Sequence, residues 1–267
     1  MIKRIELEKK HRYLIQSLLA TAFIYVVSQN IFSLSLVGMA LSSIFVVVIG
    51  TFIIHFPNVS LKNLPLITLM PISILSGSII FLRFFPNLGI PFKIVSILSF
   101  GILYYLVSLM DNIFLVIEDR GEVIPLYRVA SVWGQIIQII VAIPLFAGIF
   151  KFNTSAFTQA FLISIVSFLY CLYQIWYLKF DVDAKKTKIG ETYYLSMLTA
   201  FLVFVVTLAV SFIPTESFLR ALFSASGLMF GITYVTSYLK NELSVKLLFQ
   251  YILICLIFFL FLISFTP

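Results

Sequence analysis

Long apolar stretches alternate with short polar connections through this chain. About nine of the stretches are close to the 20 residues that an α-helix needs to cross a bilayer. We expect helices near residues 13–28, 32–56, 64–84, 91–117, 129–150, 157–179, 194–213, 218–238 and 246–265. The connections, roughly 5 to 15 residues long, are shorter than the ~50 that a soluble domain needs. The sequence therefore predicts an all-α, polytopic integral membrane protein with about nine transmembrane helices, eight or ten being the alternatives, and no soluble domain.

The composition excludes several classes of protein. Apolar residues make up 61% of the 267 residues and charged residues 11%, against about 25% charged in a soluble domain. The net charge of +7 does not indicate nucleic-acid binding, because Lys and Arg lie between the apolar stretches rather than in one water-facing patch. Cys171 and Cys255 lack the spacing of a zinc site, so we expect no metal and no cofactor.

The amino-terminal segment is basic and precedes the first apolar stretch, as in a secretory signal peptide. That stretch ends at Ser28, Gln29 and Asn30 without the small-residue pattern of a cleavage site. We therefore expect residues 1–12 to form a basic cytoplasmic segment and residues 13–267 to form a single transmembrane domain.

The distribution of basic residues predicts the orientation. With the amino terminus in the cytoplasm, 14 of the 18 Lys and Arg residues lie on the inner side. Aromatic residues that suit the headgroup region fall at the same inner ends: Tyr13, Tyr127, Trp176, Tyr177, Tyr193, Tyr194 and Tyr238. We predict a multi-pass protein of the plasma (inner) membrane with an external carboxyl terminus.

One acidic residue lies well inside an apolar stretch. Asp111 is six residues before Ile117, about 9 Å along a helix. A carboxylate there costs several kcal/mol unless it is protonated, paired or hydrated. Helical spacing places further polar residues on or beside its face: Tyr104, Ser108, Asn112 and Glu118.

The next predicted helix carries a matching row of polar residues. Arg128, Ser131, Gln135 and Gln138 recur at spacings of three or four, and Gln135 lies about as deep as Asp111. The two rows predict a polar seam that opens inward. The seam is either a proton, ion or substrate site or a set of hydrogen bonds that only hold the two helices together, worth about 0.6 to 2 kcal/mol each.

Small residues in the predicted helix 218–238 indicate a close helix contact. Gly227 and Gly231 form a GxxxG pair, and Ala221 and Ser224 continue the same face. We expect the neighbouring helix to belong to the same chain.

Two kinds of membrane enzyme do not fit the motifs. A UbiA-type prenyltransferase needs two aspartate-rich clusters to hold magnesium and pyrophosphate, whereas Asp111 stands alone. The residues around Ser226 are similar to the serine motif of rhomboid proteases, but no histidine follows them to act as a base.

The segment from Glu118 to Arg128 is acidic, contains Gly121 and then turns apolar. It resembles the coupling segment of ABC exporter permeases over about ten residues, which would imply a place in a larger assembly.

The leading hypothesis is a protein that moves or binds a small solute, ion or lipid through the polar seam. The first alternative is a non-catalytic membrane component of an assembly, an exporter permease or an envelope scaffold, with a membrane or cytoplasmic protein as its partner. The third is an enzyme acting on membrane lipid through Asp111, Glu118 and Arg128.

Overall fold

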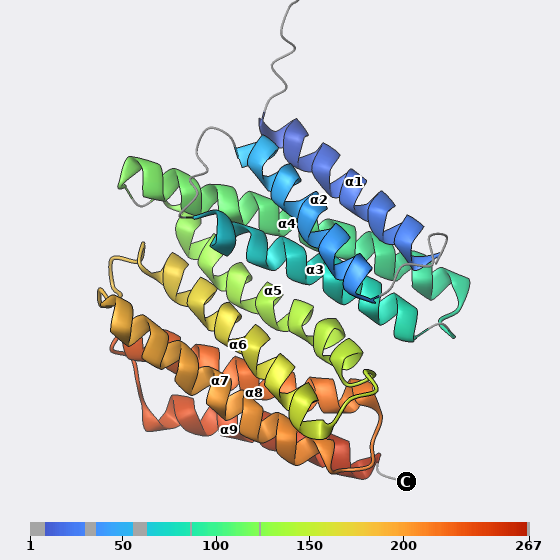
Figure 1. The fold of residues 1–267 in the computed structure, drawn as a ribbon. Coiled ribbons are helices and arrows are strands. Elements are labelled where there is room, and N and C mark those ends of the chain that lie inside the picture. Colours follow the sequence, from blue (N-terminus) through green and yellow to red (C-terminus); the bar gives the residue numbers. More distant parts are fainter. Residues whose placement is uncertain (1–8, 30–35, 56–62, 86, 123, 266–267) are drawn as a thin grey trace, which may run out of the picture. The chain divides into compact units, whose positions relative to one another are not determined.

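The structure is a computed structural model that describes residues 9–29, 36–55, 63–85, 87–122 and 124–265. The described residues form nine helices and no strand: α1 (Lys9–Ser28), α2 (Leu36–His55), α3 (Leu64–Phe84), α4 (Ile90–Arg120), α5 (Leu126–Ile149), α6 (Ala156–Leu178), α7 (Ile189–Ser211), α8 (Ser217–Leu239) and α9 (Val245–Ser264). The predicted all-α fold is thus confirmed (Figure 1). The largest difference in a boundary is at α7, which begins at Ile189 rather than near residue 194.

Eight of these helices, α2 to α9, are long and apolar enough to cross a membrane. In α1, the basic residues of the first turn lower the mean hydropathy, together with Gln16, Ser17 and Thr21. That α1 also crosses the membrane stays a prediction.

The chain divides into two compact units, Met1–Asp119 and Arg120–Pro267. In the first unit, α2 packs against α3, and α1 contacts both. Glycines let α1 approach its neighbours: a Cβ atom at Gly50 would lie 2.5 Å from Gln16 Nε2, and one at Gly101 would overlap Thr21 Oγ1. Polar side chains of α1 therefore face the interior of the first unit.

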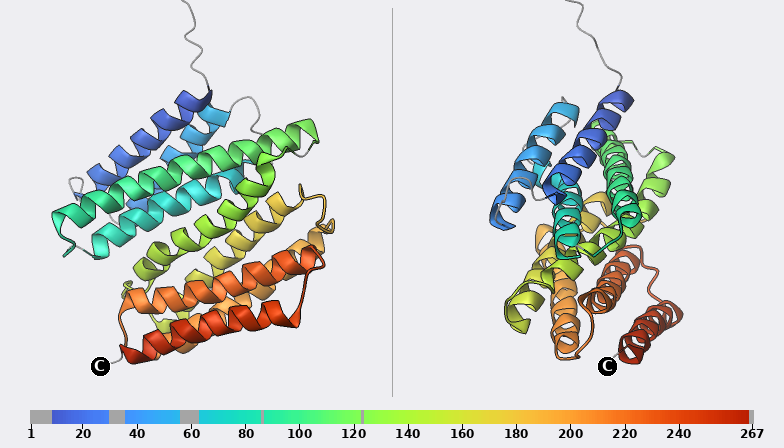
Figure 2. Two further views of the ribbon diagram at one scale, coloured as in Figure 1. Left: turned by 180° about the vertical axis from the view of Figure 1, so that it is seen from behind. Right: turned by 90° about the vertical axis from the view of Figure 1, so that its right-hand side faces the viewer.

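In the second unit, α6 packs along α7, and α8 packs against both α5 and α7. The GxxxG pair lies on the α7 side of α8, where a Cβ atom at Gly231 would be 2.7 Å from Thr199 Cγ2 and one at Gly227 3.3 Å from Val206 Cγ1. The neighbour of this face is a helix of the same chain, as predicted. Figure 2 shows α9 beside α8 at the edge of the unit.

The helix ends follow the polar breaks in the sequence. Gly121 directly follows α4 and has a φ of +69°, a left-handed conformation that glycine adopts without strain. Ser155 and Ser244 cap α6 and α9, and each hydroxyl accepts a hydrogen bond from the backbone N–H three residues later.

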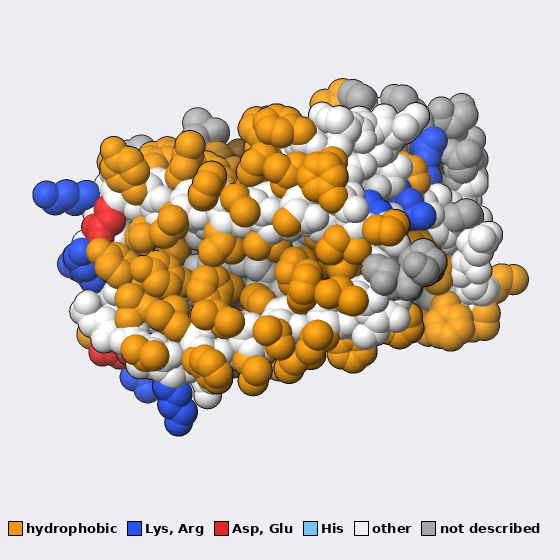
Figure 3. All heavy atoms as spheres, turned by 90° about the horizontal axis from the view of Figure 1, so that it is seen from below, with side chains coloured by type: hydrophobic (Ala, Val, Ile, Leu, Met, Phe, Trp, Pro, Cys, Tyr) orange, Lys and Arg blue, Asp and Glu red, His pale blue; other side chains and the backbone are white. Residues whose placement is uncertain are grey.

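The surface of the helices is apolar, as the membrane assignment requires. On the face drawn in Figure 3, hydrophobic side chains predominate and charged side chains are few. The most exposed helix is α9, of which only Leu262 is buried.

Candidate functional site

Asp111 lies on α4 and is completely buried. The hydroxyls of Tyr13 in α1 and Tyr104 in α4 lie within electrostatic range of its carboxyl. Asp111 is thus buried within the protein, its depth in the membrane stays a prediction, and the structure adds a residue of α1 to its surroundings.

Tyr104 connects α4 to α1. Its hydroxyl accepts a hydrogen bond from Gln16 Nε2 at 2.7 Å, and its ring is 1% exposed. Ser108, one turn closer to Asp111, is also buried, but its hydroxyl donates to the Tyr104 carbonyl oxygen of its own helix at 2.9 Å. Of these two predicted residues, Tyr104 is thus the one that bonds a neighbouring helix.

A histidine joins this group from α2. The His55 ring lies 5.4 Å from the Tyr13 ring, centroid to centroid, and both side chains are buried. We call Tyr13, Gln16, His55, Tyr104 and Asp111 the Asp111 cluster. It combines a carboxyl, an imidazole, an amide and two phenols from three helices.

The predicted site residues did not include Tyr13, Gln16 and His55. A signal was present, because Tyr13 and Gln16 lie three residues apart on one face of α1. His55 ends an apolar stretch, and its position along α2 alone does not show which helix it faces.

Asn112 and Glu118 lie at the margin of the predicted row. Asn112 is half-buried, whereas Glu118 is exposed and accepts a hydrogen bond from Asn63 Nδ2 at 2.6 Å. Asn63 is the cap residue of α3, so this bond ties the end of α4 to the start of α3.

The second predicted row of polar residues belongs to the second unit. Gln135 donates to Thr233 Oγ1 on α8 at 2.8 Å, and Gln138 donates to Gln174 Oε1 on α6 at 2.9 Å. Arg128 is exposed near the start of α5. A seam between α4 and α5 would join residues of both units, and it stays a prediction.

Gln138 is part of a buried network that links three helices. Gln174 also donates to Thr236 Oγ1 on α8 at 3.0 Å and accepts a hydrogen bond from the Tyr177 hydroxyl. Tyr127 of α5 donates to the Tyr177 carbonyl oxygen at 3.0 Å. These bonds join α5, α6 and α8 through amides, hydroxyls and carbonyls, and the Tyr127 hydroxyl also lies within electrostatic range of Asp181.

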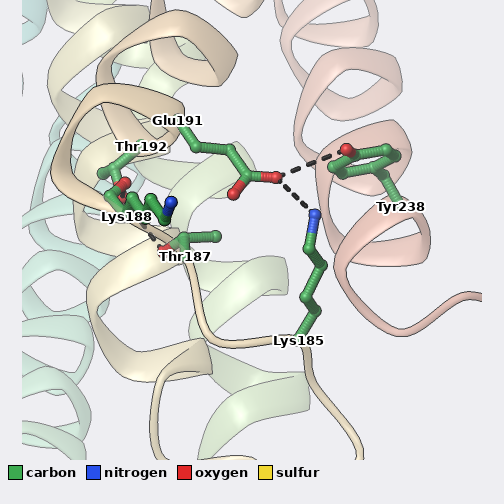
Figure 4. A network of polar contacts seen from close by, with 6 residues as sticks. All are labelled: Lys185, Thr187, Lys188, Glu191, Thr192 and Tyr238. Atoms are coloured by element: carbon green, nitrogen blue, oxygen red, sulfur yellow. Dashed lines mark hydrogen bonds and ion pairs between the residues drawn. The ribbon is translucent and has the colours of Figure 1, made fainter.

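A surface network lies at the end of the second unit where α6 and α8 end and α7 begins (Figure 4). Glu191 Oε1 is 2.8 Å from Lys185 Nζ and accepts a hydrogen bond from the Tyr238 hydroxyl at 3.3 Å. The hydrogen bond and the negative charge of Glu191 raise the pKa of Lys185 above its ordinary value. Nearby, Lys240 Nζ lies 2.7 Å from Asp181 Oδ2. The connection from α6 to α7 is thus held against the end of α8.

Comparison of the chain with family models, with curated proteins and with solved structures finds no match.

Proposed function

We propose that this membrane protein moves or binds a small solute or ion and that the Asp111 cluster is its ionisable site. The observation that carries the proposal is the complete burial of Asp111 within range of phenol hydroxyls on α1 and α4. Ionisable residues inside membrane helices are costly and commonly mark proton or ion pathways. Asp111 and His55 supply groups that can exchange a proton, and Tyr13 and Tyr104 supply hydroxyls beside them.

The second unit supports this proposal by contrast. The hydrogen bonds of its network around Gln138 join three helices through amides, hydroxyls and a backbone carbonyl. Hydrogen bonds between neutral side chains are sufficient to hold membrane helices together. A carboxyl in the first unit adds a desolvation cost that helix packing does not require, so we assign it a role in binding a proton or a cation.

The proposed orientation places the cluster near the cytoplasm. Asp111 lies seven residues before Glu118, about 10 Å along α4. With the amino terminus inside the cell, α4 ends at the cytoplasmic surface of the plasma (inner) membrane. The site would then load and release its proton or ion on the cytoplasmic side.

Asp111→Asn tests the proposal because it keeps the shape of the side chain and removes its ionisation. Purified protein is titrated with Na⁺, K⁺, Li⁺ and H⁺, with thermal stability and the infrared band of the protonated carboxyl as readouts. We expect an ion- or pH-dependent signal in the wild type and its loss in a well-folded Asp111→Asn protein. Glu122→Gln, which removes an exposed carboxyl beyond α4, serves as the matched control and retains the signal.

An Asp111→Asn protein that keeps every one of these responses would refute the ionisable site. Asp111→Leu then shows whether the residue has a packing role, because it removes the polar group altogether and leaves nearby partners without a hydrogen bond.

The second candidate function is a non-catalytic membrane component of a larger assembly. The exposure of α9 favours it, because this apolar helix contacts α8 and leaves most of its surface for other molecules in the membrane. Purification in mild detergent with mass analysis of the eluted complex tests it. A stoichiometric ATPase or membrane partner would support the assembly, and a free monomer would not.

A further inference from the structure

An apolar groove runs along the surface where α6 and α7 pack together. Its volume is about 690 Å³, and its walls include the rings of Phe157, Phe161 and Phe168 from α6 and of Tyr194, Phe201 and Phe204 from α7. From Phe157 to Phe168 it extends about 16 Å along α6. That length is about half of the ~30 Å hydrocarbon core of a bilayer.

The groove is open to the membrane along its length. Phe161 is 53% exposed and Phe201 64%. Close contacts between membrane helices favour Gly, Ala and Ser, whereas this surface presents bulky aromatic rings. Its chemistry fits a flexible hydrocarbon chain better than another helix.

Basic residues lie beyond the Tyr194 end of the groove. Lys179 follows Phe168 by eleven residues, or about three helical turns, so it continues the same face of α6. Lys186 and Lys188 lie in the connection that leads into α7, and all three lysines are exposed.

Two of the three acidic residues of this region are engaged in ion pairs, and the third, Asp183, is exposed. Asp181 pairs with Lys240 at 2.7 Å, and Glu191 pairs with Lys185 at 2.8 Å on the side facing Tyr238 (Figure 4). Within the described part of the chain, Lys179, Lys186 and Lys188 form no ion pair. Beyond this end of the groove, three lysines outside the ion pairs face one such carboxylate, that of Asp183, so the described connection carries an excess of positive charge at the predicted headgroup level.

We propose that this groove is a binding site for an anionic glycerophospholipid, with one acyl chain between α6 and α7 and the phosphate against Lys179, Lys186 and Lys188. Basic residues at the membrane surface attract anionic lipid, and each lysine that the phosphate contacts raises affinity about fivefold. The site lies wholly in the second unit and does not depend on the role of Asp111.

Tryptophan quenching by brominated lipid tests the site. Both native tryptophans are replaced, Trp133→Phe and Trp176→Phe, and one reporter is introduced, Phe201→Trp in the groove or Phe249→Trp on exposed α9. The proteins are reconstituted in vesicles that mix phosphatidylcholine with phosphatidylglycerol, one of which carries brominated chains. From the quenching at each reporter we obtain the relative affinity of that position for the two lipids. We expect it to favour phosphatidylglycerol by about fivefold or more at the groove position and to favour neither lipid at the α9 position.

The lysines are then tested in the same background. Replacing Lys179, Lys186 and Lys188 by Gln should reduce the preference for phosphatidylglycerol over phosphatidylcholine at position 201 to the value measured at position 249. Lys151→Gln, at the other end of α6, is the matched control and should leave it unchanged. Raising the salt concentration should weaken the preference, because the attraction is electrostatic.

A tryptophan at position 201 that displaced the lipid acyl chain would itself remove the signal, so a second reporter is used as a check. Phe161→Trp lies on the opposite wall of the groove. Equal quenching by the two lipids at both groove positions would overturn the proposal, as would a preference that survives in the triple lysine variant.

Discussion

Gln16 in α1 donates a hydrogen bond to the hydroxyl of Tyr104 in α4, and the two atoms lie 2.7 Å apart. Eighty-eight residues separate these partners in the sequence. The bond is buried, and it holds α1, the least apolar helix of the first unit, against α4 about two turns from Asp111. It therefore links the packing of α1 to the proposed ionisable site.

The strength of this bond is measurable by a double-mutant cycle. We predict that Gln16→Leu and Tyr104→Phe each destabilise the protein and that the coupling free energy between them is about 0.6 to 1.7 kcal/mol. Unfolding in mixed micelles with increasing denaturing detergent provides the measurement. Ser96→Ala, at an outward-facing hydroxyl that bonds its own helix, is the control. Strictly additive effects would show that the two side chains do not interact.

Gly101 is predicted to be required for the contact between α1 and α4. A Cβ atom there would overlap Thr21 Oγ1, so Gly101→Ala should cost about 1 to 3 kcal/mol of stability through overpacking. Adding Thr21→Ala should recover part of this loss. Gly190→Ala is the control, because its Cβ atom would meet only the Tyr194 ring, at 4.0 Å. Equal stability of the Gly101→Ala and Gly190→Ala proteins would contradict a close contact between Gly101 and Thr21.

The Tyr177 hydroxyl is predicted to stabilise the second unit. It bonds Gln174, and removing it leaves buried polar groups without a partner, so Tyr177→Phe should cost about 1 to 2 kcal/mol. Tyr234→Phe is the matched control on α8, where the tyrosine is half-buried. The thermal midpoint of each variant in detergent compares them. A Tyr177→Phe protein as stable as the control would mean that the network adds nothing to stability.

The bond between Lys185 and Glu191 should respond to alkaline pH. Because Glu191 raises the pKa of Lys185 above 10.5, the bond is fully present below 10.5 and is lost as pH rises through the higher value of the folded protein. Hydrogen exchange of segment 182–190 should be slower in the wild type than in Glu191→Gln between pH 7 and 10, and the two should converge at higher pH. Equal exchange at neutral pH would show that the bond does not order the connection.

Cysteine labelling tests the orientation. In a Cys171→Ala, Cys255→Ala background, a cysteine in place of Lys186 should react with a membrane-impermeant reagent only after the cells are permeabilised, because the basic connections lie inside. A cysteine in place of Asn153, in the connection at the other end of α6, should react from outside intact cells. Labelling of residue 186 from outside would reverse the topology.

Much of the architecture could be predicted without a structure. Membrane helices must satisfy their backbone hydrogen bonds internally, so length and hydropathy alone identify them. The bounds Leu64–Phe84 of α3 agree with the predicted range, and α4 ends at the polar residues before Gly121. The sequence also singled out Asp111 as a buried carboxyl, because an acidic residue inside an apolar stretch can be recognised from the sequence alone.

The lateral partners required the tertiary structure. Periodicity shows that Tyr104, Ser108 and Asp111 share a face of α4, but not that Gln16 and Tyr13 lie near them. It likewise does not show that Gln138 bonds Gln174 of α6. Which helices become neighbours, and at what rotation, depends on many small packing contacts such as that of Thr21 against Gly101. The sequence by itself therefore determined the helices and the chemistry that they carry, and the packing of the helices decided which of those chemical groups meet.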